Sequence, residues 1–338
     1  MVELARRAWE DARWSDLFQS RTGYAAERPH PGQVPAAARR MRTGEPPDRV
    51  QGPMLKPAVW TWEVPLYFWF GGIAAGSSFV ALACDLAGDE RSAATARKVS
   101  LGALVPCPAL LIADLGRPAR FVYMLRIFKP RSPMSMGTWC LSSFGALGAS
   151  AVGADLLGCR RTARRLGSAS ALLGGYLGSY TGVLLAGTAV PLWARSRVFL
   201  GPIFVATATA TGAAATRLVL AVTGPPRGHP TPAALATVET GAMLAELALS
   251  AVNERRLGRL ASGLHHGRAG RLYRGAELAV LAGLGLRFLG RRLGPRAHDA
   301  ASLLFLAAGL SFRYAWVTAG RASASDDEAV ALMARDRP

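Results

Sequence analysis

Residues 166–194, LGSASALLGGYLGSYTGVLLAGTAVPLWA, contain no Asp, Glu, Lys or Arg. Three other stretches share this property, at residues 64–84, 132–154 and 198–216. A helix of about 20 apolar residues is long enough to cross a hydrocarbon core of roughly 30 Å. Only 18% of the 338 residues are charged, against about 25% in an average soluble domain. The pattern predicts an integral membrane protein and excludes an ordinary soluble globular enzyme.

Eight apolar segments follow residue 60, and we expect each to be a transmembrane helix. They lie near residues 64–86, 96–114, 136–158, 166–191, 198–222, 232–252, 272–290 and 300–320. Lipid cannot satisfy exposed backbone groups, and spanning strands would need about 10 alternating residues each, so the expected fold is all-α. The segment at 272–290 is the weakest, because Glu277 and Arg287 bracket its short uncharged core. The many Gly and Ala residues predict close helix packing.

The charge balance agrees with a membrane location. There are 40 Lys and Arg residues against 22 Asp and Glu residues, a net charge of +18. Most Arg residues lie between apolar segments, so we interpret them as facing lipid headgroups, and we see no nucleic-acid-binding motif. The N-terminal side of the membrane holds 26 Lys and Arg residues against 13 opposite, or 16 against 13 without the distal arm and tail. This bias predicts a cytoplasmic N-terminal side.

Residues 1–60 are unlike the rest of the chain, since they are rich in Arg and Pro and hold no long apolar run. We expect an extramembrane N-terminal arm, with a short amphipathic helix over residues 1–18 and an extended part over 25–57. Such an arm either wraps a partner or lies on the membrane surface. Residues 323–338 are predicted to be a polar C-terminal tail.

Cysteine and histidine residues are few, and none is placed for a redox centre. The cysteines lack C-x-x-C spacing and lie in or at the ends of apolar segments, so we interpret them as packing residues. We expect no haem, because axial histidines would have to lie within helices, and no metal in this chain. The cysteines are Cys84, Cys107, Cys140 and Cys159, and the histidines, all in the arm or predicted loops, are His30, His229, His265, His266 and His298.

The loop after the second segment is dense in polar features. It reads ADLGRPARFVYMLRIFKPRSPMSMGTW over residues 113–139, with Asp114 at the membrane boundary and Arg117 close behind. Ser132 or Ser135 is a good N-cap for the third helix. One interpretation is that Asp114 pairs with Arg117 and only fixes the turn. The other is that the carboxylate and the guanidinium help to form a polar pocket for an amphiphilic ligand.

These residues resemble the NrfD/PsrC family, the membrane subunits of polysulfide-reductase-type complexes. The resemblance is carried by D-L-G-R-P with R-F, by S-P-M-S-x-G-x-W, and by three weaker stretches, and it covers roughly residues 60–320. The weaker stretches are EVPLYFWFGGIAAG from Glu63, YTGVLLAGTAVP from Tyr180 and RYAWVTAG from Arg313.

The resemblance implies eight transmembrane helices in two four-helix bundles, which we place at residues 61–195 and 196–322. It implies no haem, and a quinone site near the loop at 114–135 that meets an iron–sulfur (ferredoxin-like) subunit of a molybdopterin-type or similar enzyme. The chain would then be the quinone-reactive anchor of an oxidoreductase complex, acting on menaquinone or ubiquinone, with no redox activity alone. The implied site lies on the N-terminal side of the membrane.

Quinone chemistry needs hydrogen-bond donors and a route for protons. The candidates for quinone binding are Tyr180, Asp114, Arg117, Glu63 and Ser135. Tyr180 matches the tyrosine of the family's fourth helix, and its phenol can donate to a carbonyl. Two alternatives stay open: Tyr180 as an interfacial belt residue, and Glu63 as a group solvated at headgroup level.

Further ionisable residues are candidates for a proton path. Glu239 and Glu246 are seven residues apart, so they share one helix face, and Arg313 lies inside the last segment. The alternative is a buried Glu–Arg pair between the sixth and eighth helices. Asp85 and Asp155, at the opposite membrane face, are candidates for the end of a proton route; the alternative, which we favour, is that they are simply solvated.

Two other functions compete with a quinone-reactive anchor. A secondary transporter or proton-translocating module would have broken helices at matching places in both halves, but Pro106 and Pro108 supply a break in one half alone. A purely structural anchor would keep the fold without quinone chemistry.

Overall fold

The computed structural model describes residues 55, 58, 60–114, 121–223, 229–326, 329, 330 and 333. The expected helix at 1–18, most of the arm, Arg117 and most of the polar tail therefore lie outside the described residues. The chain divides into two compact units, one of residues 59–323 and one of residues 1–58 with 324–338. The first unit holds the apolar segments.

The described residues form helices and no strand, as the all-α prediction requires. Seven of the eight apolar segments each coincide with one long helix. The second is divided between two helices at Val105, because Pro106 has no N–H for the helical ladder. The helices are α3 (Glu63–Leu86), α4 (Glu90–Leu104), α5 (Pro106–Asp114), α6 (Phe121–Met124), α7 (Pro133–Leu156), α8 (Arg160–Ala186), α9 (Pro191–Arg195), α10 (Arg197–Thr223), α11 (Thr231–Leu257), α12 (Ser262–His265), α13 (Gly267–Leu293) and α14 (Pro295–Ala324), with a 3₁₀ turn at Gly258–Ala261.

Six stretches of the described chain are long and apolar enough to cross a membrane, which makes this a multi-pass membrane protein. The helices α7 and α13 fall outside this set. Six of the eight predicted transmembrane helices are therefore supported. Gly and Ser dilute the hydropathy of α7, and Arg and Glu residues interrupt α13. The six stretches are Glu63–Leu86, Glu90–Asp114, Arg160–Ala186, Arg197–Thr223, Thr231–His265 and Pro295–Ala324.

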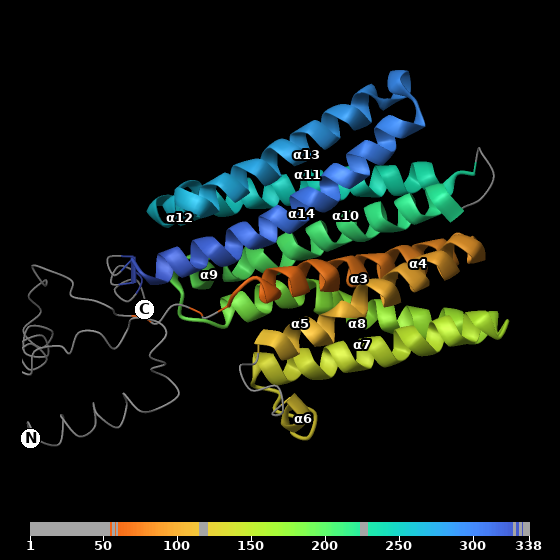
Figure 1. Ribbon diagram of the computed structural model, residues 1–338, viewed down its shortest axis with the longest axis horizontal. Coiled ribbons are helices and arrows are strands. Elements are labelled where there is room, and N and C mark those ends of the chain that lie inside the picture. Colours follow the sequence, from red (N-terminus) through yellow and green to blue (C-terminus); the bar gives the residue numbers. More distant parts are fainter. Residues whose placement is uncertain are drawn as a thin grey trace, which may run out of the picture. The chain divides into compact units, whose positions relative to one another are not determined.

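Consecutive long helices run in opposite directions (Figure 1). We call end A the end at which α3 begins and α14 finishes, and end B the end at which α3 finishes and α4 begins. Short turns at end B reverse the chain through Gly88 and Gly158, whose φ angles of 78° and 75° favour glycine. Asp89 caps α4 by accepting from the Ser92 N–H at 3.1 Å.

Helices α3 and α10 form the centre of the unit. The helix α3 contacts α4, α5, α8 and α10, and α10 also contacts α11. Gly76 and Gly212 face each other where α3 crosses α10, and a Cβ atom on Gly212 would overlap the backbone of Gly76. The predicted boundary between two bundles coincides with the short break between α9 and α10, but residues on both sides of it belong to one compact unit. Two separate bundles therefore stay a prediction.

The last helix is joined to the first by hydrogen bonds from side chains to backbone carbonyls. The Arg313 Nε donates to the Phe68 carbonyl at 2.8 Å, and the Trp69 Nε1 donates to Leu306 at 3.0 Å. The Tyr314 hydroxyl donates to Trp62 at 2.9 Å. These bonds join the part of α14 between Leu306 and Tyr314 to the start of α3, so the first and last long helices are packed together.

Candidate functional site

Two carboxylates meet at end A, where α3 begins and α5 finishes. Glu63 is the first residue of α3 and accepts a hydrogen bond from the Thr61 hydroxyl. Asp114 is the last residue of α5, and its carboxylate interacts electrostatically with that of Glu63. The structure thus brings together two of the predicted quinone-site residues that are 51 positions apart in the sequence.

Two tyrosines lie deeper in the same region. Tyr67 on α3 and Tyr180 on α8 are buried, with 3% and 5% of their surface exposed, and their side chains lie near each other. Within the described part of the chain, neither hydroxyl has a hydrogen-bond partner. Gly137 on α7 lies against the Tyr180 ring, and a Cβ atom there would overlap it. The position of Tyr180 therefore depends on a residue without a side chain.

The carboxylates and the phenols belong to one continuous strip. Glu63 and Tyr67 are four residues apart and share a face of α3. Cys107 and Asp114 are seven residues apart on α5, and Tyr67 interacts with Cys107 as Glu63 does with Asp114. The strip offers two phenol donors inside and two carboxyl groups at the surface, which is a suitable arrangement for binding a carbonyl oxygen and delivering protons to it.

Of the two serines predicted as caps, the structure selects Ser132. Its hydroxyl accepts from the Ser135 N–H at 3.4 Å, and Pro133 occupies the first turn. The Ser135 hydroxyl accepts from the Lys129 N–H at 3.0 Å and donates to the Ile127 carbonyl at 3.2 Å. Ser135 thus closes the loop before α7, and its one hydroxyl proton is already used in the hydrogen bond to Ile127.

The segment between the site and α7 exposes large apolar side chains. Figure 1 shows its short helix α6 standing away from the longer helices. Contiguous exposed apolar groups on a protein surface commonly mark contact with a partner or with lipid. The exposed side chains are Val122, Tyr123, Leu125, Ile127 and Phe128.

At end B the expectation that Asp85 and Asp155 are solvated is wrong. Both carboxylates bind Arg97 of α4, which donates to Asp85 at 2.7 Å and to both oxygens of Asp155 at 2.6 and 2.9 Å. The Arg97 side chain is only 6% exposed. These residues, which we call the Arg97 cluster (Asp85, Arg97 and Asp155), join α3, α4 and α7.

The alternative of a buried Glu–Arg ion pair between the sixth and eighth helices is not found among the described residues. Glu239 on α11 pairs with Arg287 on α13 and accepts from the Ser302 hydroxyl of α14 at 2.8 Å. Arg217 of α10 joins this group, since it donates to Ser302 at 3.0 Å and pairs with Asp299 at 3.0 Å. We call these residues the Arg287 cluster; its members are Arg217, Glu239, Arg287, Asp299 and Ser302.

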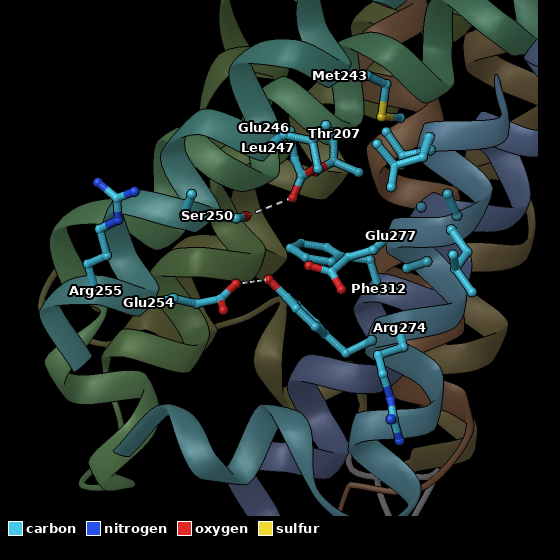
Figure 2. A pocket seen from close by; sticks show the side chains of 18 residues that line it. Thr207, Met243, Glu246, Leu247, Ser250, Glu254, Arg255, Arg274, Glu277 and Phe312 are labelled. Atoms are coloured by element: carbon cyan, nitrogen blue, oxygen red, sulfur yellow. Dashed lines mark hydrogen bonds between the residues drawn. The ribbon is translucent and has the colours of Figure 1, made fainter. Parts of the chain in front are cut away.

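Glu246 and Arg313 lie one level nearer end A. The Ser250 hydroxyl donates to Glu246 at 2.8 Å (Figure 2), and Glu246 attracts Arg313 without a direct ion pair. The guanidinium of Arg313 lies over the Phe204 ring in a space that Gly72 leaves open. Figure 2 shows Glu246 lining a cavity between α11 and α13.

Several residues of these sites were missed by sequence reasoning. Tyr67 lies within a stretch quoted for its glycines, and Arg97 was interpreted, with most other arginines, as facing lipid headgroups. His298, expected in a loop, lies within α14 and accepts from Arg287 at 3.1 Å through Nδ1. Cys84, Cys107 and Cys140 are buried as expected of packing residues, whereas Cys159 is exposed. The signal for Tyr67 was its spacing of four residues from Glu63.

The fold and the polar strip at end A define a membrane protein with many spans and an ionisable group at the edge of its first helix. Residues 52–253 match the family described as polysulphide reductase, NrfD. Because this match covers more than half of the chain, the protein belongs to the NrfD family. The matched region ends within α11, before Arg313 and the last two long helices. A comparison with curated proteins gives no match.

Proposed function

We propose that this protein is the haem-free membrane anchor of an oxidoreductase complex and exchanges electrons between an iron–sulfur partner subunit and the membrane quinone pool. The observation that carries the proposal is the pair of buried phenols, Tyr67 and Tyr180, without partners among the described residues, with Tyr67 one helical turn inward from Glu63. Membership of the NrfD family supports the assignment to a redox complex.

Reduction of a quinone takes up two electrons and two protons. Tyr180 and Tyr67 would donate hydrogen bonds to a quinone carbonyl, which stabilises the negative charge that the oxygen acquires when electrons arrive. Asp114 and Glu63, nearer the surface, would pass protons inward from water. Oxidation of a quinol would run the same steps in reverse, with the carboxylates accepting the protons.

Electrons would come from a cluster held by a partner subunit docked at end A. The exposed apolar side chains around α6 lie in the loop between Asp114 and α7, so they are well placed to contact such a partner. This subunit would belong to a molybdopterin-type or similar enzyme. Arg117, which lies outside the described residues, remains a candidate for quinone binding on the resemblance alone.

The arrangement in the membrane follows from the same proposal. We place α7 and α13 across the membrane as well, because each packs beside helices that meet the length and hydropathy needed to cross. This gives eight spans, with a first bundle of α3 to α8 and a second of α10 to α14. End A would face the cytoplasm, in accordance with the bias in Lys and Arg residues.

The decisive experiment is Tyr180→Phe in the complex purified from membranes. Loss of the hydroxyl should lower the rate of quinone reduction by about 10²-fold while the iron–sulfur subunit still copurifies. Tyr176→Phe is the matched control: Tyr176 lies one turn away on α8, with its ring centroid 6.0 Å from that of Tyr180. It should keep the rate close to that of the unchanged protein.

The same experiment separates the rival functions. An unchanged rate in both Tyr180→Phe and Asp114→Asn, with the complex intact, would identify a structural anchor without quinone chemistry. A protein that purifies alone, without any iron–sulfur subunit, would favour a transporter.

A further inference from the structure

A cavity of about 660 Å³ lies among α10, α11, α13 and α14, away from the proposed quinone site (Figure 2). Its walls are mostly apolar, yet they carry three carboxylates, Glu246, Glu254 and Glu277. Exposed Arg255 and Arg274 line its outer end, close to the turn that joins α11 to α13 at end A. A cavity of this size and polarity is large enough to hold water.

Protonatable groups follow one another from the outer end of this cavity inward. At the surface, the ring of His265 lies 3.0 Å from the Glu254 carboxylate. Glu254 accepts from the hydroxyl of Tyr273, which is 1% exposed. The innermost group is Glu246, 5% exposed and hydrogen-bonded to Ser250. Ionisable side chains at such depth in a membrane helix are costly and usually serve a cavity or a pathway.

An apolar layer closes the inner end of the cavity. Met243 lies between Glu246 and Glu239 on α11, and Phe305 lies between Gly309 and Ser302 on α14. Each of the four helices contributes to this layer, which lies between the cavity and the Arg287 cluster. The layer consists of Ala210, Met243, Val280, Leu284, Phe305 and Ala308, all buried.

Beyond the layer, the Arg287 cluster contains buried polar atoms that its own members do not satisfy. Within the described chain, Glu239 Oε1, Arg287 Nε and Arg217 Nε have no hydrogen-bond partner. Buried polar atoms of this kind are usually satisfied by internal water. Asp299, the outermost member, is 35% exposed near end B. The cluster is thus a second polar region, with its own access to the opposite membrane face.

We propose that these two polar regions form an interrupted proton path among α10, α11, α13 and α14, with Glu246 as the inner proton carrier and the apolar layer as its gate. A proton taken up by the Glu246 carboxylate would pass through transient water to Glu239 Oε1, which regenerates the Glu246 carboxylate. It would then leave by Asp299 at end B. The Glu239 carboxylate, restored, would pair again with Arg287.

The separation of the Glu246 and Glu239 carboxylates agrees with a gate that opens transiently rather than with a permanent chain of hydrogen bonds. Seven residues of helix place their Cα atoms about 10 Å apart along α11, which is too far for a hydrogen bond but within the reach of two or three water molecules. Hydrophobic constrictions gate channels by excluding water until they widen. The closed layer seen here would prevent protons from leaking across the membrane at rest.

The gate is tested with the full chain reconstituted in vesicles that enclose a pH-sensitive dye, with a potassium diffusion potential driving proton entry. Met243→Ser should raise the rate of proton entry by about tenfold or more, because a hydroxyl in the layer admits water. Leu244→Ser is the matched control, since Leu244 is the next residue on α11 and is 46% exposed. It should leave proton entry unchanged.

The double variant Met243→Ser with Glu246→Gln tests the carrier. It should return proton entry to the level of Leu244→Ser. Equal rates in the single and double variants, or no increase in a folded Met243→Ser, would overturn the proposal.

A second measurement uses the unmodified chain and does not depend on the layer variants. Dicyclohexylcarbodiimide enters apolar sites and forms a stable adduct with a protonated carboxylic acid. Mass spectrometry should find the adduct on Glu246, and Glu246→Gln should lose it. Absence of an adduct on Glu246 in folded protein would argue that this carboxyl carries no proton. Neither measurement involves quinone, so their failure would leave the proposed function untouched.

Discussion

The Arg97 cluster and the Arg287 cluster place buried ion pairs near the same end of the molecule, yet they are built differently. In the Arg97 cluster, the two carboxylates receive three hydrogen bonds from one guanidinium at 2.6 to 2.9 Å. In the Arg287 cluster, two guanidiniums and the Glu239 carboxylate share Ser302, Asp299 pairs with Arg217, and three buried polar atoms remain without a partner in the described chain.

This difference separates a structural group from one suited to move protons. A fully satisfied cluster holds its helices in one arrangement, and any change in its protonation breaks strong bonds. A cluster with unsatisfied atoms has places for water and can accept a proton without losing all its contacts. The four predictions below test this distinction with matched changes at the two clusters and at the turn next to them.

The largest effect is expected for Arg97→Met. This change leaves the buried carboxylates of Asp85 and Asp155 without their cation, which should cost about 3–5 kcal/mol of the free energy of unfolding. Thermal unfolding in detergent should show a large fall in midpoint, or the protein should fail to accumulate in membranes. A midpoint within a degree of the unchanged protein would show that the cluster is not structural.

Arg287→Met should cost less, about 1–2 kcal/mol, because Glu239 keeps the hydrogen bond from Ser302 and the attraction of Arg217. The two Arg→Met proteins are compared in the same detergent and by the same scan. A loss equal to that of Arg97→Met would remove the distinction between the clusters.

A smaller effect is expected at Asp89, in the turn between α3 and α4. Burial alone would raise the pKa of Asp89, but hydrogen bonds from Ser92 and Thr231 outweigh it and hold the pKa below its ordinary value. Asp89→Ala should cost about 1 kcal/mol through loss of the cap, whereas Asp89→Asn keeps the cap and should cost less.

The pH dependence of the Asp89→Ala effect has a definite sign. Because the folded-state pKa is lowered, the ionised carboxylate contributes stability above its unfolded pKa of about 4 and loses it as the pH falls through the folded value. The difference in midpoint between Asp89→Ala and the unchanged protein should therefore shrink below about pH 4. A difference that grows in acid would contradict the assignment.

The smallest effect is expected for Arg160→Ala, which removes the pair with Glu90 at the same end. Both side chains are well exposed, at 75% and 54%. Exposed pairs contribute less than about 0.5 kcal/mol and are screened by salt. The midpoint should hardly move, and raising the salt concentration should erase what difference there is.

Much of the fold could be predicted from the sequence, because a long uncharged segment in lipid can satisfy its own backbone hydrogen bonds only as a helix. The eight segments followed from this, and the N-cap of α7 was narrowed to Ser132 or Ser135, of which the structure selects Ser132. The division of the second segment at Pro106 is a local effect of the missing N–H. What the sequence could not settle is membrane crossing by α7 and α13, because Gly, Ser and Arg lower their hydropathy below that of their neighbours.

The pairing of buried charges was predicted poorly, and the reason is geometric. Which residues meet depends on the rotation and vertical offset of each helix, which small residues such as Gly76 and Gly212 set through close contact. Glu239 consequently meets Arg287 of α13 rather than an arginine of the eighth helix, and Asp155 meets Arg97 rather than water. Of the residues predicted for the quinone site, Glu63 and Asp114 lie on helices that pack together, α3 and α5, while Tyr67 was missed.

The hydrogen bonds from α14 to the backbone of α3 have a consequence for biosynthesis. The carbonyl of Phe68 enters the bilayer early, but its partner Arg313 is made some 240 residues later. The opening helix must therefore wait in a provisional arrangement until translation is nearly complete, and chains cut short before Arg313 should be recognised by quality-control proteases as unfinished.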